Sequence, residues 1–430
     1  TTLSDASPTQ RLYRIVEEGL CIGCGLCESI AGSDKIRVAK VRSGYEAPVA
    51  IADPPAAIVD RIYAVCPGLR VNGLPTDEID GETETDLIWG PIRRIVRVWA
   101  GDAYVRHRGA TGGVLTALAQ FLLTSDKVDA VLHVRPGSAD PAFGEPTLSF
   151  TPEAVLAGAG SRYGPAAPLR TINAVLARGL HLAVIGKPCD LTALRNYARY
   201  DTRINELVRY WLTPVCGGFM PPVGMQQFLL RTGINPADVV RVHYRGEGCP
   251  GPTRISLRGG TSREFDYLDF WGEDESQWVL PFRCKVCADG TGESADIAAS
   301  DTWPGGSPER GASVSDAGTN AVVARTRRGA QLLEDAAAAG AIAIGGEEDA
   351  RYMDLVQPHQ RRKKLAVLAR WRGLAAAGRL VPESERLRLE ELATALGQPE
   401  CEAQTRGTVA RIEQGKASEP TPELAEQEYR

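Results

Sequence analysis

Compact apolar runs alternate with amphipathic stretches along the middle of this 430-residue chain. The runs are short and continuously apolar, as in strands that are buried on both faces of a sheet. Helical periodicity follows two of them, at 114–123 and from residue 191. This alternation predicts a mostly parallel sheet, with ligand-binding loops at the carboxyl ends of its strands. Strands are expected at 93–100, 130–134, 181–185, 208–215 and 321–325.

The two ends of the chain follow other patterns. Residues 11–75 contain one short alternating strand, at 35–39, among closely spaced cysteines. Residues 76–91 are acidic and carry turn-forming residues, which predicts a solvated linker; a docking surface for an electron-transfer partner is the less favoured interpretation. Further on, a basic helix is expected at 357–378, and after Pro382 a charged, partly helical tail with a mobile end.

Composition narrows the class of protein. Hydrophobic residues make up 43% and charged residues 24% of the chain, as in ordinary globular proteins. The net charge of −5 argues against a nucleic-acid partner. No apolar run approaches the roughly 20 residues of a membrane span, and the polar start does not resemble a signal peptide. Most of the ten cysteines stand at metal-ligand spacings, so we expect a reducing, cytoplasmic location.

The clearest chemical motif is a C-x2-C-x2-C run formed by Cys21, Cys24 and Cys27, with Cys66 and its following proline as a fourth position. This spacing is typical of a ferredoxin-type [4Fe–4S] site, in which four thiolates converge on one cluster. The intervening glycines allow the backbone to curl and to point N–H groups at the sulfurs. Zinc is the alternative, but zinc sites usually pair C-x2-C units, so the triplet favours iron and sulfide.

A second set of cysteines is scattered along the chain: Cys189, Cys216, Cys284 and Cys287. Two of them follow expected strands and two form a C-x2-C in a loop, so a parallel sheet could bring all four to one edge. Spacing alone leaves a second metal centre and ordinary packed thiols equally open. The C-x2-C pair also fits zinc as well as iron.

One loop has the residue types of a phosphate site. It consists of Gly109, Ala110, Thr111, Gly112 and Gly113 and opens a predicted helix, where free N–H groups attract anions. We call it the glycine loop. It matches neither Walker A nor G-x-G-x-x-G, so a tight turn that needs positive φ explains it equally well.

Two neighbouring features could serve the same ligand. Ser161, Arg162 and Tyr163 offer a hydroxyl, a guanidinium and an aromatic plane suited to a flavin or its pyrophosphate, although an ordinary surface turn has the same composition. His107 precedes the glycine loop and is a candidate proton donor. A surface histidine in a basic turn is its more common role.

Taken in order, these motifs resemble those of one protein family. Over about residues 15–375 the chain is similar to the coenzyme F420 hydrogenase/dehydrogenase β-subunit family, which also contains 7-hydroxymethyl chlorophyll a reductases and an iron–sulfur divinyl chlorophyllide reductase. The resemblance rests on the two cysteine sets, the glycine loop, Ser-Arg-Tyr-Gly-Pro at 161–165, Gly-Lys-Pro-Cys-Asp at 186–190 and Ala-Asp-Ile at 295–297.

The resemblance implies a flavoprotein with FAD and two [4Fe–4S] clusters, or one at minimum. It assigns the glycine loop and residues 161–163 to the flavin, and the second cysteine set to the second cluster. It also places Lys187 near the isoalloxazine, where a cation stabilises the reduced flavin; a surface lysine at a turn is the alternative. The residues around Cys21 differ from those of the chlorophyll reductases, which argues against a tetrapyrrole substrate. Cys249 and Cys401 have no partner at ligand spacing and are expected to be free.

The expected fold is therefore α/β: an N-terminal ferredoxin-like [4Fe–4S] unit, a mostly parallel α/β flavin-binding domain and a helical C-terminal tail. The division that we predict is a ferredoxin-like domain (11–75), an acidic linker (76–91), an FAD-binding domain with the second iron–sulfur site (92–350) and a C-terminal helical region with a mobile tail (351–430).

The expected function is an iron–sulfur flavoprotein oxidoreductase that passes electrons from a ferredoxin-like donor through the clusters to FAD and reduces a small organic substrate. The alternative is an F420-oxidising or F420-reducing β subunit of a larger hydrogenase or dehydrogenase complex. A third interpretation is a non-enzymatic electron-transfer or scaffold subunit. The chain would act as a homo-oligomer or with a partner subunit.

Overall fold

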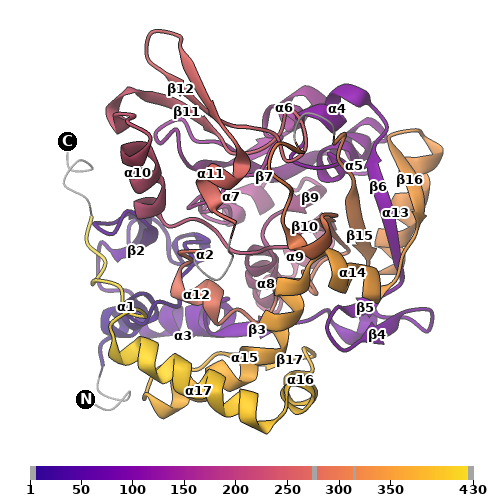
Figure 1. The fold of residues 1–430 in the computed structure, drawn as a ribbon. Coiled ribbons are helices and arrows are strands. Elements are labelled where there is room, and N and C mark those ends of the chain that lie inside the picture. Colours follow the sequence, from indigo (N-terminus) through magenta and orange to yellow (C-terminus); the bar gives the residue numbers. More distant parts are fainter. Residues whose placement is uncertain (1–5, 274–277, 313–315, 425–430) are drawn as a thin grey trace.

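The computed structural model describes residues 6–273, 278–312 and 316–424. At its centre is an eight-stranded sheet with the order β16-β6-β15-β14-β10-β9-β7-β8, seen in Figure 1. The strands are β6 (Arg94–Ala100), β7 (Ala130–Pro136), β8 (Gly144–Ser149), β9 (Leu182–Ile185), β10 (Val208–Pro214), β14 (Ile297–Asp301), β15 (Asn320–Ala324) and β16 (Ile342–Glu347).

The centre of this sheet is parallel. Strands β14, β10, β9 and β7 pair in parallel with one another, whereas β15, β16 and β8 join antiparallel. Strand β6 pairs antiparallel with β15 and so points the same way as the central four. Five of the eight described strands therefore share one direction, and their carboxyl ends meet at one edge. The sheet is mixed, with antiparallel strands outside its parallel centre.

Helices cover both faces of the sheet. Helices α5 (Val114–Thr124) and α13 (Arg327–Ala338) place Leu118 and Leu332 in the same apolar cluster as Val98 of the sheet. On the other face, α8 (Pro188–Tyr197) packs Leu191 against Val184. Each such buried Leu or Val contributes about 1.5–3 kcal/mol relative to exposure to water. The expected helices at 114–123 and from 191 are confirmed. Shorter helices complete these layers: α4 (Ala103–Arg108), α6 (Pro152–Ala157), α7 (Ile172–Leu176) and α9 (Arg203–Leu207).

The N-terminal unit is built from helices around one hairpin. The hairpin pairs β1 (Ile36–Lys40) with β2 (Glu46–Ala50), and the strand expected at 35–39 is its first arm. A short strand, β3 (Arg70–Asn72), pairs in parallel with β17 (Glu383–Glu385) from the far end of the chain. The C-terminal region therefore completes the N-terminal unit. The helices of the N-terminal unit are α1 (Pro8–Glu17), α2 (Leu26–Ala31) and α3 (Ala56–Val65).

The acidic segment 76–91 is bound to the body of the protein. It forms a 3-10 turn, η1 (Thr76–Glu78), and a small hairpin of β4 (Glu84–Asp86) and β5 (Gly90–Ile92). Trp89 is fully buried, and its indole donates to Asp354 at 3.0 Å. Glu78 pairs with Arg195 at 3.0 Å. Glu78 and Asp80 have arginine partners on the body, whereas Asp77, Glu82 and Glu84 are exposed.

Residues between β10 and β14 form a separate lobe. Strands β11 (Val239–His243), β12 (Thr253–Leu257) and β13 (Ser262–Phe265) make an antiparallel sheet. Helices α10 (Pro222–Arg231) and α11 (Tyr267–Trp271) pack against it through Phe228 and Phe270, whose ring centroids lie 5.1 Å apart. A 3-10 helix, η2 (Pro236–Asp238), precedes β11. The aromatic richness of this stretch therefore supplies the core of the lobe.

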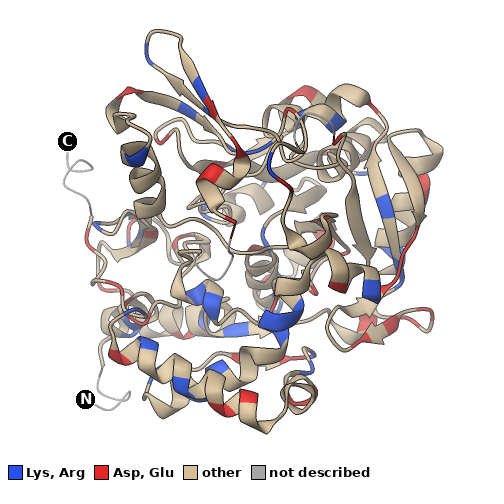
Figure 2. Ribbon diagram, viewed as in Figure 1, with Lys and Arg blue, Asp and Glu red and all other residues tan. Residues whose placement is uncertain are grey.

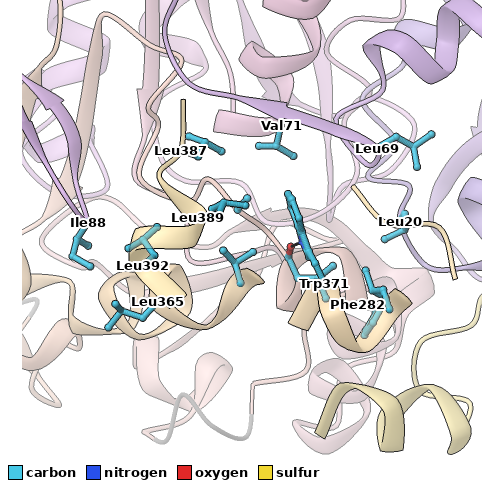
Figure 3. Packing of buried hydrophobic residues seen from close by; sticks show 14 of the residues in the cluster. Leu20, Leu69, Val71, Ile88, Phe282, Leu365, Trp371, Leu387, Leu389 and Leu392 are labelled. Atoms are coloured by element: carbon cyan, nitrogen blue, oxygen red, sulfur yellow. Dashed lines mark hydrogen bonds between the residues drawn. The ribbon is translucent and has the colours of Figure 1, made fainter. Parts of the chain in front are cut away.

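One apolar cluster joins the N-terminal unit to the C-terminal helices, as Figure 3 shows. Leu20 and Leu69 flank the first cysteine set in the sequence, and Phe282 precedes Cys284. All three pack in the same cluster as Trp371. A single core therefore fixes both cysteine-bearing segments. The helices on this side are α12 (Phe282–Lys285), α14 (Ala350–Val356), α15 (Pro358–Ala376), α16 (Leu389–Leu396) and α17 (Gln398–Glu413).

The C-terminal region is helical, and the basic helix expected at 357–378 is α15. The last residues, 425–430, for which a mobile end is predicted, lie outside the described residues. None of the described helices combines the length and the apolar character needed to cross a membrane.

Candidate functional site

A cavity of about 330 Å³ lies at the edge where the carboxyl ends of the parallel strands meet. Ile185, Pro214 and Asp301, the last residues of β9, β10 and β14, all line it. We call it the sheet-edge cavity. Its volume is near the lower limit of the roughly 300–1,000 Å³ typical of ligand and cofactor sites. It occupies the edge at which open α/β sheets bind ligands.

The glycine loop connects α4 to α5 and is a tight turn as well as a wall of the cavity. Gly113 has φ +70°, and a Cβ there would stand 2.7 Å from the carbonyl oxygen of Val105. The backbone N–H of Gly112 donates to Asn320 Oδ1 at 3.0 Å. The loop can therefore be a tight turn and part of a ligand site at the same time. Its cavity-lining members are Gly109, Ala110, Thr111 and Gly113.

A buried ion pair supports the loop from the opposite wall. Thr111 donates its hydroxyl hydrogen to Asp301. Arg245, which is 5% exposed, donates to Thr111 Oγ1 at 3.0 Å and to Asp301 Oδ1 at 2.9 Å. Burial disfavours the Arg245 charge, but the carboxylate of Asp301 outweighs it and raises the pKa of Arg245 well above its ordinary value. The cavity therefore has a permanent cation held beneath its glycine loop.

The structure brings residues 161–163 to the same cavity, beside an aromatic wall. The Tyr163 ring meets Trp271 edge-on, with centroids 4.6 Å apart. Arg245 lies 4.8 Å from the ring centroid of Trp303. Several cavity-lining N–H groups are buried without a hydrogen-bond partner among the described residues, and they would suit a ligand rich in acceptors. They are Nε of Arg162 and Arg245 and the indole nitrogens of Trp271, Trp278 and Trp303.

Lys187 lines the cavity at the start of α8 and is 22% exposed. Its Nζ lies 2.7 Å from Oδ2 of Asp190, a carboxylate that is almost fully buried. Burial disfavours the ammonium, but Asp190 outweighs this effect and raises the pKa of Lys187 above its ordinary value. Lys187 is thus a fixed cation in the wall of the cavity.

The histidines differ in their relation to the cavity. His133 lines it, its Nε2 lies 2.8 Å from Ser149 Oγ, and burial lowers its pKa to about 4. His359 also lines the cavity, and burial lowers its pKa to about 4. His107 is exposed on α4 and is absent from the described residues that line the cavity. The expectation that His107 donates a proton there gains no support from its position.

The first cysteine set surrounds a small apolar cavity of about 30 Å³, which all four thiols line. The Gly23 backbone N–H donates to Cys21 Sγ at 3.4 Å, as expected for a sulfur-binding loop. Burial, followed by the charge of Cys66, raises the pKa of Cys21 to about 12. Burial and the charge of Cys66 likewise raise the pKa of Cys24. Converging thiols, an apolar enclosure and an N–H···S bond fit a thiolate-bound cluster.

The second cysteine set comes from separate parts of the chain that lie near one another. Cys189 is the second residue of α8, Cys216 follows β10, and Cys284 and Cys287 come from α12 and the turn after it. Burial raises the pKa of Cys284 to about 12, with further contributions from Cys216 and Cys287. Burial likewise raises the pKa of Cys189, and Cys216 and Cys287 add to the shift. Cys216 also lines the sheet-edge cavity, so this set lies directly beside it.

The two cysteine sets are neighbours. Ile22 packs in one apolar cluster with Cys24 of the first set and with Cys189 and Cys284 of the second. Within residues 6–273, 278–312 and 316–424, no three His, Cys, Asp or Glu side chains form a group that could hold a single metal ion. Cys249 and Cys401 are free and buried, and neither belongs to these sets.

Comparison with known proteins identifies the family. The model for the N-terminal part of the coenzyme F420 hydrogenase/dehydrogenase beta subunit matches residues 95–173, and the model for its C terminus matches residues 180–350. Together they span more than half of the chain. The chain belongs to the coenzyme F420 hydrogenase/dehydrogenase beta-subunit family. The family resemblance expected from the motifs is confirmed.

Individual relatives agree with this assignment. The chain is 30% identical over 241 residues to F420-dependent formate dehydrogenase 1 subunit beta of Methanococcus maripaludis, an alignment that covers 56% of this chain and 58% of that protein. It is 27% identical over 188 residues to the chloroplastic 7-hydroxymethyl chlorophyll a reductase of rice. That alignment covers 43% of this chain and 38% of the reductase. The chain thus spans about three fifths or less of these relatives.

A chain of the F420-reducing [NiFe] hydrogenase complex from Methanosarcina barkeri has a similar fold, with a TM-score of 0.51 at 20% identity; the match covers 65% of this chain and 91% of that chain. The mixed α/β fold is therefore that of the family. The matched family regions contain the glycine loop, residues 161–163, Lys187 and the second cysteine set. The first cysteine set and α15 to α17 lie outside them.

Proposed function

We propose that this chain is the electron-input β subunit of an F420-dependent oxidoreductase. In this role it exchanges electrons between the deazaflavin F420 and a redox partner, with FAD in the sheet-edge cavity and [4Fe–4S] clusters at the two cysteine sets. The observation that carries the proposal is Cys216, which belongs to the second cysteine set and also lines the cavity. A cluster and a flavin held at these places would be direct neighbours.

Several groups that line the cavity support the proposal of FAD. The N–H groups of Gly109 and Gly112 already have acceptors, Val105 and Asn320, so a pyrophosphate at the start of α5 would face the N–H groups of the other loop residues. Arg162 adds a positive charge, and burial lowers its pKa only to about 10. Lys187 and Arg245 keep their charges through Asp190 and Asp301. A flavin bound here would connect one-electron carriers to a two-electron hydride carrier.

His133 is neutral at physiological pH, because its pKa of about 4 is far below 7. It can therefore accept or donate a hydrogen bond at the cavity without adding charge. With Lys187 as a fixed cation, the wall favours a ligand that gains negative charge on reduction.

The reduction of an organic substrate with electrons from ferredoxin is the second candidate function. The relative that favours it is the chlorophyll a reductase, of which the chain matches 38%. The F420-dependent relative aligns over a larger part of this chain, and for that reason the β-subunit role comes first. One activity assay separates the two functions: turnover of F420 with a viologen dye and no organic substrate supports the first.

The experiment begins with anaerobic purification of the whole chain and measurement of iron, sulfide and flavin. About eight iron and one FAD per chain are expected for two clusters and one flavin. Reduced F420 should then reduce benzyl viologen in the presence of this chain alone. Zinc in place of iron would contradict the redox role. Clusters without flavin would support the scaffold interpretation, and a fully loaded chain that leaves F420 untouched would contradict the β-subunit role.

A further inference from the structure

Four basic side chains gather around the second cysteine set: Lys285, Lys363, Arg370 and Arg411. We call them the basic surface. Lys285 stands between Cys284 and Cys287 in the sequence. It is half-buried, and Arg411 and Arg370 are close enough for their charges to act on it. The three elements that carry these residues, α12, α15 and α17, are far apart in the sequence but adjacent in space, as Figures 1 and 2 show.

Three of the four basic side chains donate hydrogen bonds to backbone carbonyl oxygens or to a side-chain amide oxygen. Arg370 Nη1 donates to the carbonyl of Lys285 at 2.6 Å, and its Nε donates to Gln404 at 2.9 Å. Lys285 Nζ donates to the carbonyl of Trp278 at 3.2 Å. Lys363 Nζ lies 3.4 Å from the carbonyl of Cys216. In the described parts of the chain, no carboxylate forms an ion pair with any of the four.

This arrangement is unusual for the chain as a whole, which has a net charge of −5. Most surface arginines have carboxylate partners, for example Arg372 with Glu390 at 3.1 Å. Like charges held close together repel one another in the isolated chain. That repulsion is offset when a negatively charged surface approaches, because the unpaired cations then gain partners. Val279 follows Trp278 in the sequence, and 57% of its surface is exposed. It offers a hydrophobic contact beside the basic surface.

We propose that the basic surface is the docking site of an acidic electron-carrier protein, which exchanges electrons directly with the second cysteine set. The inference rests on the proposed function, since it takes that set to hold a cluster. Electron transfer falls steeply with distance, and a carrier docked at Lys285 is separated from Cys284 and Cys287 by their own loop. Electrons would then enter at the second set, beside the sheet-edge cavity, rather than at the first set.

The test uses a small acidic [2Fe–2S] ferredoxin as the probe and compares two double variants of the full chain. Lys285→Gln with Arg411→Gln removes two charges from the basic surface. Arg372→Gln with Arg406→Gln removes two charges from α15 and α17 at positions that have carboxylate partners. Binding is measured by calorimetry at low salt and at about 0.5 M salt, where surface charges are screened. The single variant Arg411→Gln is included as well, because replacing Lys285 also changes the surroundings of the neighbouring cysteines.

Wild type should bind the ferredoxin at low salt, and the basic-surface variant should bind about tenfold more weakly, with the difference lost at high salt. The control variant should bind like wild type. Equal binding by wild type and the basic-surface variant would overturn the proposal, and so would equally tight binding of a DNA oligonucleotide. This assay needs no turnover. Missing iron or flavin would count against the proposed function alone, whereas salt-independent binding would count against the docking surface alone.

The kinetic form of the test measures reduction of the bound clusters by prereduced ferredoxin. Each rate is divided by the rate with reduced methyl viologen, a small dye that needs no protein docking. The normalised rate should fall about tenfold in the basic-surface variant at low salt. A normalised rate that falls equally in the control variant would overturn the assignment of docking to this face.

Discussion

The buried guanidinium of Arg283 donates a hydrogen bond to the backbone carbonyl of Pro67, the residue that follows Cys66. Arg283 itself precedes Cys284, so this bond connects the two cysteine sets. Burial disfavours its charge, but Cys287 and Cys189 outweigh it and raise the pKa of Arg283. Burial raises the pKa of Cys66, and the charge of Arg283 opposes that rise. One cation therefore acts on both sets.

Replacing Arg283 by Met should lower the reduction potentials of both proposed clusters, because a nearby positive charge favours the more negative, reduced state. The expected shift is on the order of 50 mV, close to a tenfold change for one electron. An EPR-monitored redox titration measures it. Loss of the buried hydrogen bond should also cost roughly 2–3 kcal/mol of stability.

Arg325→Met is the matched control, since Arg325 is also fully buried and donates to backbone carbonyls, including that of Pro91 at 2.8 Å. It should lose similar stability without a change in potential. Arg283→Lys retains the charge and covers the case in which the methionine variant fails to fold. Equal potentials in Arg283→Met and wild type would contradict this role.

Replacing Cys284 by Ser should remove the second cluster and lower the iron content from about eight to about four per chain. Cys401→Ser is the control. Cys401 is also buried, but its thiol contacts the carbonyl of Ala393 at 3.4 Å, far from both sets in the sequence. Its replacement should leave the iron content unchanged. Iron and sulfide assays on anaerobically purified protein decide the outcome, and unchanged iron in Cys284→Ser would leave the first set as the sole candidate.

Periodicity and loop chemistry predicted the strands and helices of the sheet well. The run at 208–215 is β10, and the glycine loop does open α5. Because these runs are apolar on both faces, they could only be central strands, and their carboxyl ends had to meet at one edge. Lys187 follows β9 and lines the cavity at that edge, whereas the expectation that Tyr163 lies at the ligand site came from its motif and from the family resemblance. The run at 321–325 is β15, but its antiparallel direction was not predicted, since an apolar run does not show its direction; β8 and β16 were not predicted at all.

Other parts of the site left no signal in the sequence. Arg245 comes from the separate lobe, and its partner Asp301 ends a strand that was not predicted. Neither residue stands in a motif, and only tertiary folding brings them 2.9 Å apart. Asp301 does follow a short apolar run, and that position at a strand end was the one available clue. In segment 76–91, the arginine partners of Glu78 (Arg195 and Arg328) lie more than a hundred residues away in the sequence, so the local charge pattern does not show that Glu78 is paired.

Replacing Gly113 by Ala should destabilise the glycine loop and weaken flavin retention. The substitution forces alanine into φ +70° and puts its Cβ 2.7 Å from the Val105 carbonyl. The positive φ costs about 1–2 kcal/mol, and the steric contact adds roughly 1–3 kcal/mol. Gly340→Ala is the matched control, because Gly340 has φ +73° with nothing within 4 Å of its added Cβ.

The measurements are the melting temperature and the flavin content after gel filtration. Gly113→Ala should lose more stability than Gly340→Ala and should alone lose flavin. If both variants melt together and keep their flavin, the loop does not hold the cofactor.

Acid should destabilise the protein through His133. Its folded-state pKa of about 4 is below the ordinary value near 6.5, so the unfolded chain binds a proton that the folded chain does not. Stability is therefore complete above pH 6.5 and falls as the pH drops from about 6.5 to about 4, by about 3 kcal/mol for this group. His133→Gln should reduce that loss.

The control for this prediction is His181→Gln, since His181 is about half exposed. Urea unfolding at pH 7.0, 6.0, 5.0 and 4.5 gives the free energy of unfolding for each variant. Carboxylates titrate in all three proteins alike, so the difference between the two variants isolates the buried histidine. A steep acid dependence that survives in His133→Gln as fully as in His181→Gln would show that other groups cause it. A selective loss of the dependence in His133→Gln would establish that a neutral His133 stabilises the wall of the cavity.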